Sequence, residues 1–173
     1  MTEIVKLMGW NFRGEAKARP PTDECPTPHY HFVMNIIVWN SRGVLKPNFQ
    51  KHVKELTRNH DPAMFMVMET RLGGERAKEI TDRLPFDGVI HTVTIGYIGG
   101  LWVLWNSDKV EVTQMANIEQ EIHMSIKVHS SDFSWILSAM YTSPRLEERT
   151  ILWNNLAIVA EYHNLPWVIA EFQ

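Results

Sequence analysis

The sequence has little cysteine, no long apolar run and little excess charge, and each shortage excludes a class of protein. Its single cysteine, Cys25, rules out an internal disulfide and favours a reducing, intracellular compartment, either cytoplasm or nucleus. No apolar run approaches the roughly 20 residues that a membrane-crossing helix needs. Glu3 and Lys6 interrupt the only short apolar stretch near the N-terminus, so we expect no signal peptide. The formal net charge of −3 argues against a highly basic protein that coats nucleic acid.

Apolar and aromatic residues are abundant by contrast. Of the 173 residues, 45% are hydrophobic and seven are tryptophan, which predicts a chain that buries a core. The length fits one domain or part of a larger one. The stretch from Arg19 to Pro28 is polar and rich in proline. We therefore expect residues 1–33 to form an extended or disordered tail and residues 34–173 to form the folded part.

Apolar stretches of strand length and helix length alternate from Asn35 onward. Strands are predicted at residues 35–39, 64–68, 86–94, 101–105, from 110, 122–128, 133–141 and 166–170, and helices around residues 49–56, 77–84 and 144–159. In the strand at 122–128 apolar residues alternate with His123, Ser125 and Lys127, which predicts a half-buried strand. Short turns between strands predict antiparallel pairing. The last predicted strand lacks a following partner, a pattern typical of the first part of a larger α+β domain.

Two polar residues stand where predicted strands end. Asn40 follows the strand at 35–39, and Glu69 follows the strand at 64–68. Strand ends are where α/β proteins place their chemistry, because the sheet holds the side chain while the loop leaves it open. An amide oxygen and a carboxylate together suit a hard cation such as Mg²⁺. The alternatives are a turn-forming asparagine and a solvated carboxylate.

Five short motifs occur in an order that resembles a known family. They are WNSRG at 39–43, METR at 68–71, GGLWVLW at 99–105, YTSPR at 141–145 and PWVIAEFQ at 166–173. Their order resembles the endonuclease/exonuclease/phosphatase superfamily, and most closely the N-terminal endonuclease of plant-type non-LTR (LINE) retrotransposon reverse transcriptase proteins. The resemblance covers residues 34–173. It implies a four-layer α/β/β/α sandwich of the DNase-I-like type, an α+β fold of which only the N-terminal part is present.

The same resemblance implies a reaction and the residues that perform it. Members of the family cleave phosphate esters with Mg²⁺, and Mn²⁺ is an alternative ion. The resemblance assigns metal binding to Asn40 and Glu69, catalysis to Tyr141, Glu171 and Gln173, and phosphate or DNA contact to Arg145. Hydrolysis of a phosphodiester builds charge on the phosphoryl oxygens, which a cation or fixed donors must stabilise, and it needs a group that activates water.

The sequence departs from the family at its last motif. The family's GDFN is replaced by Ala170, Glu171, Phe172 and Gln173, so both polar side chains are one methylene longer. A catalytic carboxylate misplaced by about 1 Å costs roughly 10²-fold in rate. The family's later aspartate–histidine pair does not follow, which removes acid–base assistance worth about 10²- to 10⁴-fold. We therefore expect a fragment of a Mg²⁺-dependent DNA endonuclease with little or no activity of its own.

Two other functions stay open from the sequence. One is a non-catalytic module of the same fold that binds nucleic acid or protein, and the other is an exonuclease or phosphatase acting on phosphate esters. DNA is the expected partner in the first interpretation. The sequence predicts no membrane association and no disulfide-linked partner, and it leaves the oligomeric state open.

Overall fold

The structure is a computed structural model of the chain, and it describes residues 5–14, 30–92, 99–118, 120–131, 133–141 and 146–172. Within these ranges the elements run in the order β1 (Val5–Gly14), β2 (Tyr30–Asn40), α1 (Phe49–His60), β3 (Met64–Met68), α2 (Gly74–Thr81), β4 (Gly88–His91), β5 (Leu101–Trp105), β6 (Val110–Ile118), β7 (Glu121–Val128), β8 (Ser134–Tyr141), α3 (Leu146–Tyr162) and β9 (Trp167–Phe172). No helix among these residues is long and apolar enough to cross a membrane.

The strands form two mixed sheets. The first has the order β1-β2-β3-β5-β4 and the second the order β6-β7-β8-β9. Strands β2 and β3 are parallel, with Asn40 beside Met68, and β8 and β9 are parallel, with Tyr141 beside Phe172. The predicted antiparallel pairing is confirmed for β6, β7 and β8. Each parallel pair is joined through a helix, α1 in one sheet and α3 in the other, and places its two carboxyl ends at the same edge.

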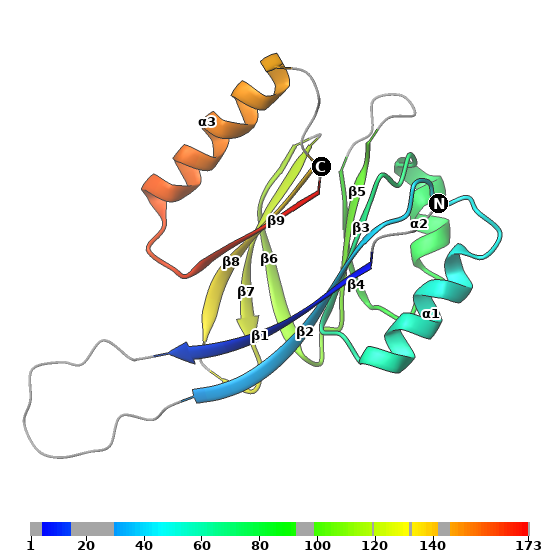
Figure 1. The fold of residues 1–173 in the computed structure, drawn as a ribbon, viewed down its shortest axis with the longest axis horizontal. Coiled ribbons are helices and arrows are strands. Elements are labelled where there is room, and N and C mark those ends of the chain that lie inside the picture. Colours follow the sequence, from blue (N-terminus) through cyan, green and yellow to red (C-terminus); the bar gives the residue numbers. More distant parts are fainter. Residues whose placement is uncertain are drawn as a thin grey trace, which may run out of the picture.

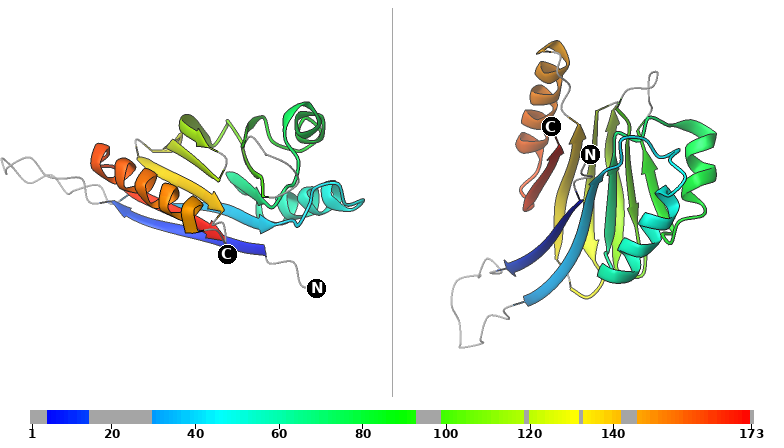
Figure 2. Two further views of the ribbon diagram at one scale, coloured as in Figure 1. Left: turned by 90° about the horizontal axis from the view of Figure 1, so that it is seen from above. Right: turned by 45° about the vertical axis from the view of Figure 1, so that its right-hand side comes forward.

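The two sheets lie face to face, with helices on the outer sides (Figures 1 and 2). Helices α1 and α2 cover the first sheet, and α3 covers the second. The side chains packed between the sheets include Val38, Met66, Val103, Ile122 and Leu137. All five residues of β3 are buried because this strand has a packed layer on each face. The structure is therefore an α+β sandwich, as predicted (Figure 1).

A second core fills the space between the first sheet and its helices. Trp39 stacks on Phe49 of α1, with 5.3 Å between the ring centroids, and meets Phe65 edge-on at 6.3 Å. Trp39, Phe49 and Phe65 are each at most 2% exposed. Because buried aromatic pairs add about 0.5–1.5 kcal/mol beyond area burial, this cluster fixes α1 against the end of β2.

The N-terminal region differs from the expected tail. Residues Val5–Gly14 form β1, which pairs antiparallel with β2 and places Val5 opposite Trp39. Strand β2 also begins at Tyr30, earlier than the predicted boundary at residue 34. The proline-rich composition is confined to residues after Arg19, whereas the segment from Val5 contains apolar residues that suit a strand. The proline-rich stretch itself lies outside the described residues.

The first half of β7 is more deeply buried than the predicted half-buried strand. His123 is 1% exposed, and Glu121, at the start of the strand, is also 1% exposed. Helix α3 lies over this face of the second sheet (Figure 1). Its Leu152 and Leu156 pack with Met140 of β8. The alternating pattern predicted a half-buried strand, but a helix distant in sequence covers the polar side.

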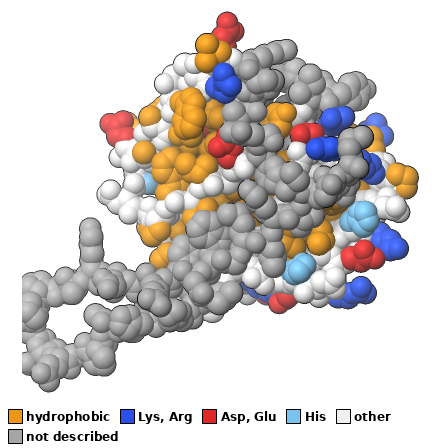
Figure 3. All heavy atoms as spheres, viewed as in Figure 1, with side chains coloured by type: hydrophobic (Ala, Val, Ile, Leu, Met, Phe, Trp, Pro, Cys, Tyr) orange, Lys and Arg blue, Asp and Glu red, His pale blue; other side chains and the backbone are white. Residues whose placement is uncertain are grey.

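Helix α3 also carries apolar residues that face away from the sheet. Figure 3 shows hydrophobic side chains gathered on the side of the molecule where α3 and β9 lie. The exposed large hydrophobic residues of α3, the segment after it and β9 are Leu146, Ile151, Trp153, Ile158, Tyr162, Leu165 and Ile169.

Candidate functional site

The carboxyl ends of β2 and β3 form one edge of the first sheet, here called the rim. Asn40 is the last residue of β2, and Glu69 is the first residue after β3. Because the two strands are parallel and in register, the backbone brings these two positions side by side. Ser41 extends the pairing beyond the strand, since its backbone nitrogen donates to the Met68 carbonyl at 3.0 Å.

Asn40 and Glu69 are in direct contact. The Asn40 side-chain nitrogen Nδ2 donates to the Glu69 oxygen Oε1 at 2.8 Å. The Asn40 oxygen Oδ1 accepts a hydrogen bond from the Arg42 backbone nitrogen at 3.1 Å. Asn40 is 8% exposed, whereas the Glu69 side chain is 21% exposed. The amide is therefore fixed at both ends, and it orients a carboxylate that stays open to solvent.

The backbone at the rim adopts an uncommon conformation. Arg42, Glu69 and Arg71 have φ values of 51°, 52° and 57°, which lie in the left-handed region. Non-glycine residues in this region cost of order 1 kcal/mol or more each, and they cluster at functional sites. The fourth such residue in the described part of the chain, Asp61, ends α1. The concentration at the rim is an independent sign that this edge is specialised.

The two loops at the rim are bonded to each other and to the start of β5. Val44 donates through its backbone nitrogen to the Thr70 carbonyl at 3.2 Å. Thr70 and Arg71 donate to the carbonyls of Gly100 and Gly99 at 3.1 and 2.9 Å. Gly99 and Gly100 have φ values of 73° and 89°, which favour glycine. The glycine pair thus holds the segment that carries Glu69.

Gly99 also brings the second sheet to the rim. A Cβ added at Gly99 would lie 3.8 Å from Cδ1 of Tyr141, so the tyrosine ring packs beside this glycine. Tyr141 is the last residue of β8, is half-buried, and donates its backbone N–H to the Gln120 carbonyl at 2.8 Å. Tyr141 is thus linked to the Glu69 loop through Gly99, whose carbonyl accepts a hydrogen bond from the Arg71 backbone.

The remaining predicted residues are placed less fully. Glu171 lies on β9 beside Met140, one residue before Tyr141 in the register, and it is exposed. Its strand ends at the same edge of the sheet as β8. Arg145 and Gln173 lie outside the described residues, so their roles stay predictions.

The rim fits a weakly held divalent cation better than a protein-enclosed one. No group of three or more His, Cys, Asp or Glu side chains that could hold a metal lies within the described ranges. Mg²⁺, however, keeps several waters and binds through one or two carboxylates together with substrate phosphates. Glu69 offers a partly exposed carboxylate, and a cationic group, the Arg71 guanidinium, already lies 3.6 Å from its Oε2. A metal ion at this oxygen would take the place of the Arg71 charge.

Sequence reasoning missed Arg71 and the part played by the glycine pair. Arg71 was visible as the last letter of METR, but its approach to Glu69 depends on the left-handed backbone at both residues. The pair Gly99–Gly100 signalled a turn, without indicating that its carbonyls bond the Glu69 loop. Neither feature leaves a periodic signal in the sequence.

Comparison with known proteins supports the fold. The sequence matches no family model and no curated protein. Among solved structures, an endonuclease/exonuclease/phosphatase family protein from Bacteroides thetaiotaomicron is similar over 80% of this chain, with a TM-score of 0.58 and 12% identity. The endonuclease domain of TRAS1, a telomere-specific non-LTR retrotransposon, is similar over 79% of this chain, with a TM-score of 0.54 and 12% identity.

A third similar structure is TDP2 of D. rerio in complex with a single-stranded DNA product, with a TM-score of 0.50, 14% identity and 79% of this chain covered. The match covers 62%, 57% and 58% of these three chains, so this chain spans somewhat less than two thirds of their length. At these identities the likeness establishes the fold alone. The protein has the fold of endonuclease/exonuclease/phosphatase proteins, as the motif order predicted.

Proposed function

We propose that the rim is the metal-binding part of a phosphodiesterase site, and that it binds Mg²⁺ and DNA as in a retrotransposon-type endonuclease. The observation that carries this proposal is the Asn40–Glu69 pair at 2.8 Å, joined through the glycine pair to Tyr141. The similarity to the TRAS1 endonuclease domain and to a DNA-bound enzyme favours DNA over a small phosphate ester.

Each residue has a defined task in this proposal. Glu69 would hold the cation, which supplies positive charge against the phosphoryl oxygens. Asn40 orients the Glu69 carboxylate through its Nδ2 and keeps its own Oδ1 on the Arg42 backbone. The Tyr141 hydroxyl would donate to a phosphate oxygen, since the ring packs beside Gly99, whose carbonyl accepts the Arg71 backbone N–H.

Turnover by this chain is expected to be slow or absent. Glu171 stands where the family has an aspartate, and its side chain is one methylene longer. An acid–base group displaced by about 1 Å costs roughly 10²-fold in rate. Binding is therefore a more sensitive test of the site than cleavage.

The test measures DNA binding in Mg²⁺ and in EDTA. Wild-type protein is expected to bind a labelled DNA duplex more tightly in Mg²⁺, and the difference should vanish in Glu69→Gln. Glu161→Gln, which changes an exposed glutamate on α3, is the matched control and should behave as wild type. If DNA affinity changes neither on removal of Mg²⁺ nor in Glu69→Gln, the proposal is refuted and a non-catalytic module is favoured.

A plasmid-nicking assay completes the experiment. Slow Mg²⁺-dependent nicking that is lost in Glu69→Gln would show that the rim still catalyses hydrolysis. Metal-dependent DNA binding without nicking would leave a binding site derived from an endonuclease. Release of phosphate from small esters, with no DNA binding, would indicate that the substrate is a small phosphate ester and not DNA.

A further inference from the structure

Both oxygens of the Glu69 carboxylate have positive or polar neighbours in the structure. Oε1 accepts the Asn40 amide at 2.8 Å, and Oε2 lies 3.6 Å from the Arg71 guanidinium nitrogen NH2. The first contact is an ordinary hydrogen bond. The second is longer than the roughly 3.2 Å limit of a good N–H···O bond, so it is an electrostatic contact without close hydrogen-bond geometry.

Among the described residues, the backbone of Arg71 makes a hydrogen bond, whereas its guanidinium makes the longer contact with Glu69. The Arg71 backbone nitrogen donates to the Gly99 carbonyl at 2.9 Å. Its Cδ passes beside Gly43, where an added Cβ would lie 3.9 Å away. The side chain as a whole is 53% exposed. The guanidinium can therefore change position while the loop that carries Glu69 stays in place.

We propose that Arg71 is an exchangeable counter-ion that couples metal binding to DNA binding at the rim. In the protein without metal, its guanidinium neutralises Glu69. When a divalent cation binds at Glu69, the guanidinium leaves the carboxylate, because two cations repel each other at one anionic group. It is then available to a DNA phosphate, which its planar fork suits. This inference rests on the proposed function and names the residue that regulates the same site.

The exchange makes two opposite predictions for one substitution. Removing the charge at Arg71 removes a competitor for Glu69, so Mg²⁺ should bind more tightly when no DNA is present. Removing it also removes a phosphate contact, so DNA should bind more weakly when Mg²⁺ is saturating. A residue with a merely structural role would move both affinities in the same direction.

The first experiment is a calorimetric titration of the full chain with Mg²⁺ in the absence of DNA. Arg71→Gln is expected to tighten Mg²⁺ binding about two- to five-fold, the range that a partly exposed ion pair allows. Arg76→Gln, which neutralises an exposed arginine on α2, is the matched control and should leave the affinity unchanged. Arg71→Gly serves as a second variant, because glycine suits the φ of 57° at this position and so preserves the loop.

The second experiment measures DNA affinity against salt concentration, in Mg²⁺ and in EDTA. In Mg²⁺ the negative slope of log K against log salt should become less steep by about 0.9 in Arg71→Gln, which corresponds to the loss of one phosphate contact. In EDTA, where the guanidinium stays on Glu69, the slopes of wild type and variant should agree.

The outcomes separate this inference from the function on which it rests. If wild type binds Mg²⁺ through Glu69 but Arg71→Gln and Arg71→Gly bind it no more tightly, the exchange is refuted and the metal site stands. If the salt slope falls equally in Mg²⁺ and EDTA, Arg71 contacts DNA without exchange, and the inference is again refuted. If neither wild type nor any Arg71 variant binds Mg²⁺, the proposed metal site fails and the inference fails with it.

Discussion

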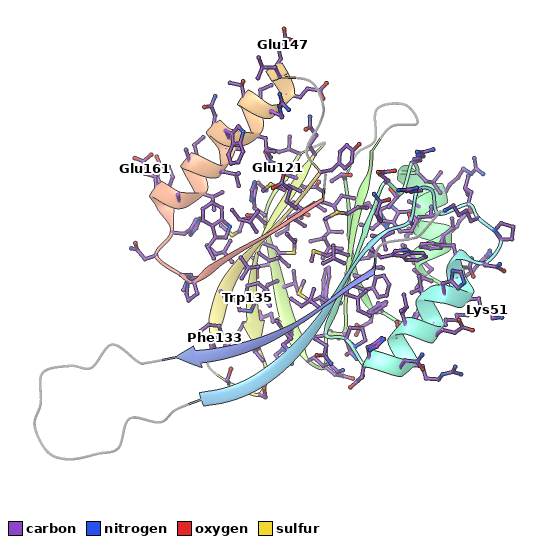
Figure 4. All side chains as sticks on the ribbon, in the orientation of Figure 1. Lys51, Glu121, Phe133, Trp135, Glu147 and Glu161 are labelled. Carbon is purple, nitrogen blue, oxygen red and sulfur yellow. The ribbon has the colours of Figure 1, made fainter. Side chains whose placement is uncertain are left out.

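Two glutamates in this protein each accept a hydrogen bond from an asparagine amide, and they lie in opposite environments. Glu69 is held by Asn40 at the rim and keeps 21% of its side chain exposed. Glu121 is held by Asn155 of α3 and has a side chain that is 2% exposed. In Figure 4 Glu121 lies between the second sheet and α3. The same chemical pair thus occurs once with access to solvent and once without it.

The buried carboxylate belongs to a chain of side-chain hydrogen bonds. The Trp167 indole N–H donates to the Ser138 oxygen at 2.8 Å, and Ser138 lies 2.6 Å from Nδ1 of His123. Nε2 of His123 lies 3.0 Å from Glu121, whose other oxygen accepts the Asn155 amide. Because an indole only donates, the Ser138 oxygen is the acceptor for Trp167, and Ser138 in turn contacts His123.

The contrast shows which features distinguish the carboxylate of the proposed site from a structural one. The buried chain has a serine, a histidine and a glutamate in hydrogen-bond order, as hydrolases do, yet Ser138 is fully buried and His123 is 1% exposed. It joins α3 and β9 to β7 and β8. Glu69 also has a partner on each carboxylate oxygen, but it has solvent access and a left-handed backbone. Exposure and strain, and not residue types, separate the two roles.

The largest expected effect is on stability and comes from Glu121→Ala. The change leaves the Asn155 amide and His123 Nε2 without their acceptor inside the protein, which should lower the free energy of unfolding by about 2–5 kcal/mol. Urea denaturation measures this loss in the free energy of unfolding. Glu161→Ala, on the outer surface of α3, is the control and should stay within about 0.5 kcal/mol of wild type. Equal stability of the two variants would show that the buried chain does not hold α3 in place.

A smaller loss is expected from Ser138→Ala. The substitution removes the acceptor of the Trp167 indole and the hydrogen-bond partner of His123 Nδ1, and the site is 0% exposed, so water replaces neither. The free energy of unfolding should fall by about 1–3 kcal/mol. Ser107→Ala, at an exposed turn, tests whether loss of a serine hydroxyl alone has this effect. A fall of the same size in both variants would contradict the special position of Ser138.

The difference between the two glutamates also marks how far the sequence predicts this protein. Asn40 and Glu69 were predictable because each follows an apolar strand of five or more residues, and parallel neighbours bring such ends together. Glu121 and His123 were not, since only the packing of α3 buries the polar side of β7. Strand β1 escaped prediction for a similar reason, because its pairing with β2 spans a proline-rich segment. Long-range packing decided each of these cases.

The most direct comparison replaces the asparagine that donates a hydrogen bond to each glutamate, Asn40 for Glu69 and Asn155 for Glu121. Asn155→Ala leaves an oxygen of Glu121 unpaired in a dry environment and should cost about 1–3 kcal/mol. Asn40→Ala leaves Glu69 able to turn to solvent, so its cost should be about 1 kcal/mol or less. Parallel urea titrations of the two variants measure the difference. A larger loss in Asn40→Ala than in Asn155→Ala would reverse the assignment of structural and functional pairs.

The smallest effect on stability is expected from Glu69→Gln. The amide keeps an oxygen that accepts the Asn40 Nδ2 hydrogen, and the side chain already meets solvent, so the free energy of unfolding should change by about 0.5 kcal/mol or less. The same change removes the charge that a divalent cation requires, so Mg²⁺ binding should be lost while the fold persists. Thermal melting with and without Mg²⁺ measures both quantities in one sample: wild type should gain stability from Mg²⁺, and the variant should not. A variant that melts well below wild type without Mg²⁺ would mean that Glu69, like Glu121, is needed for the fold itself.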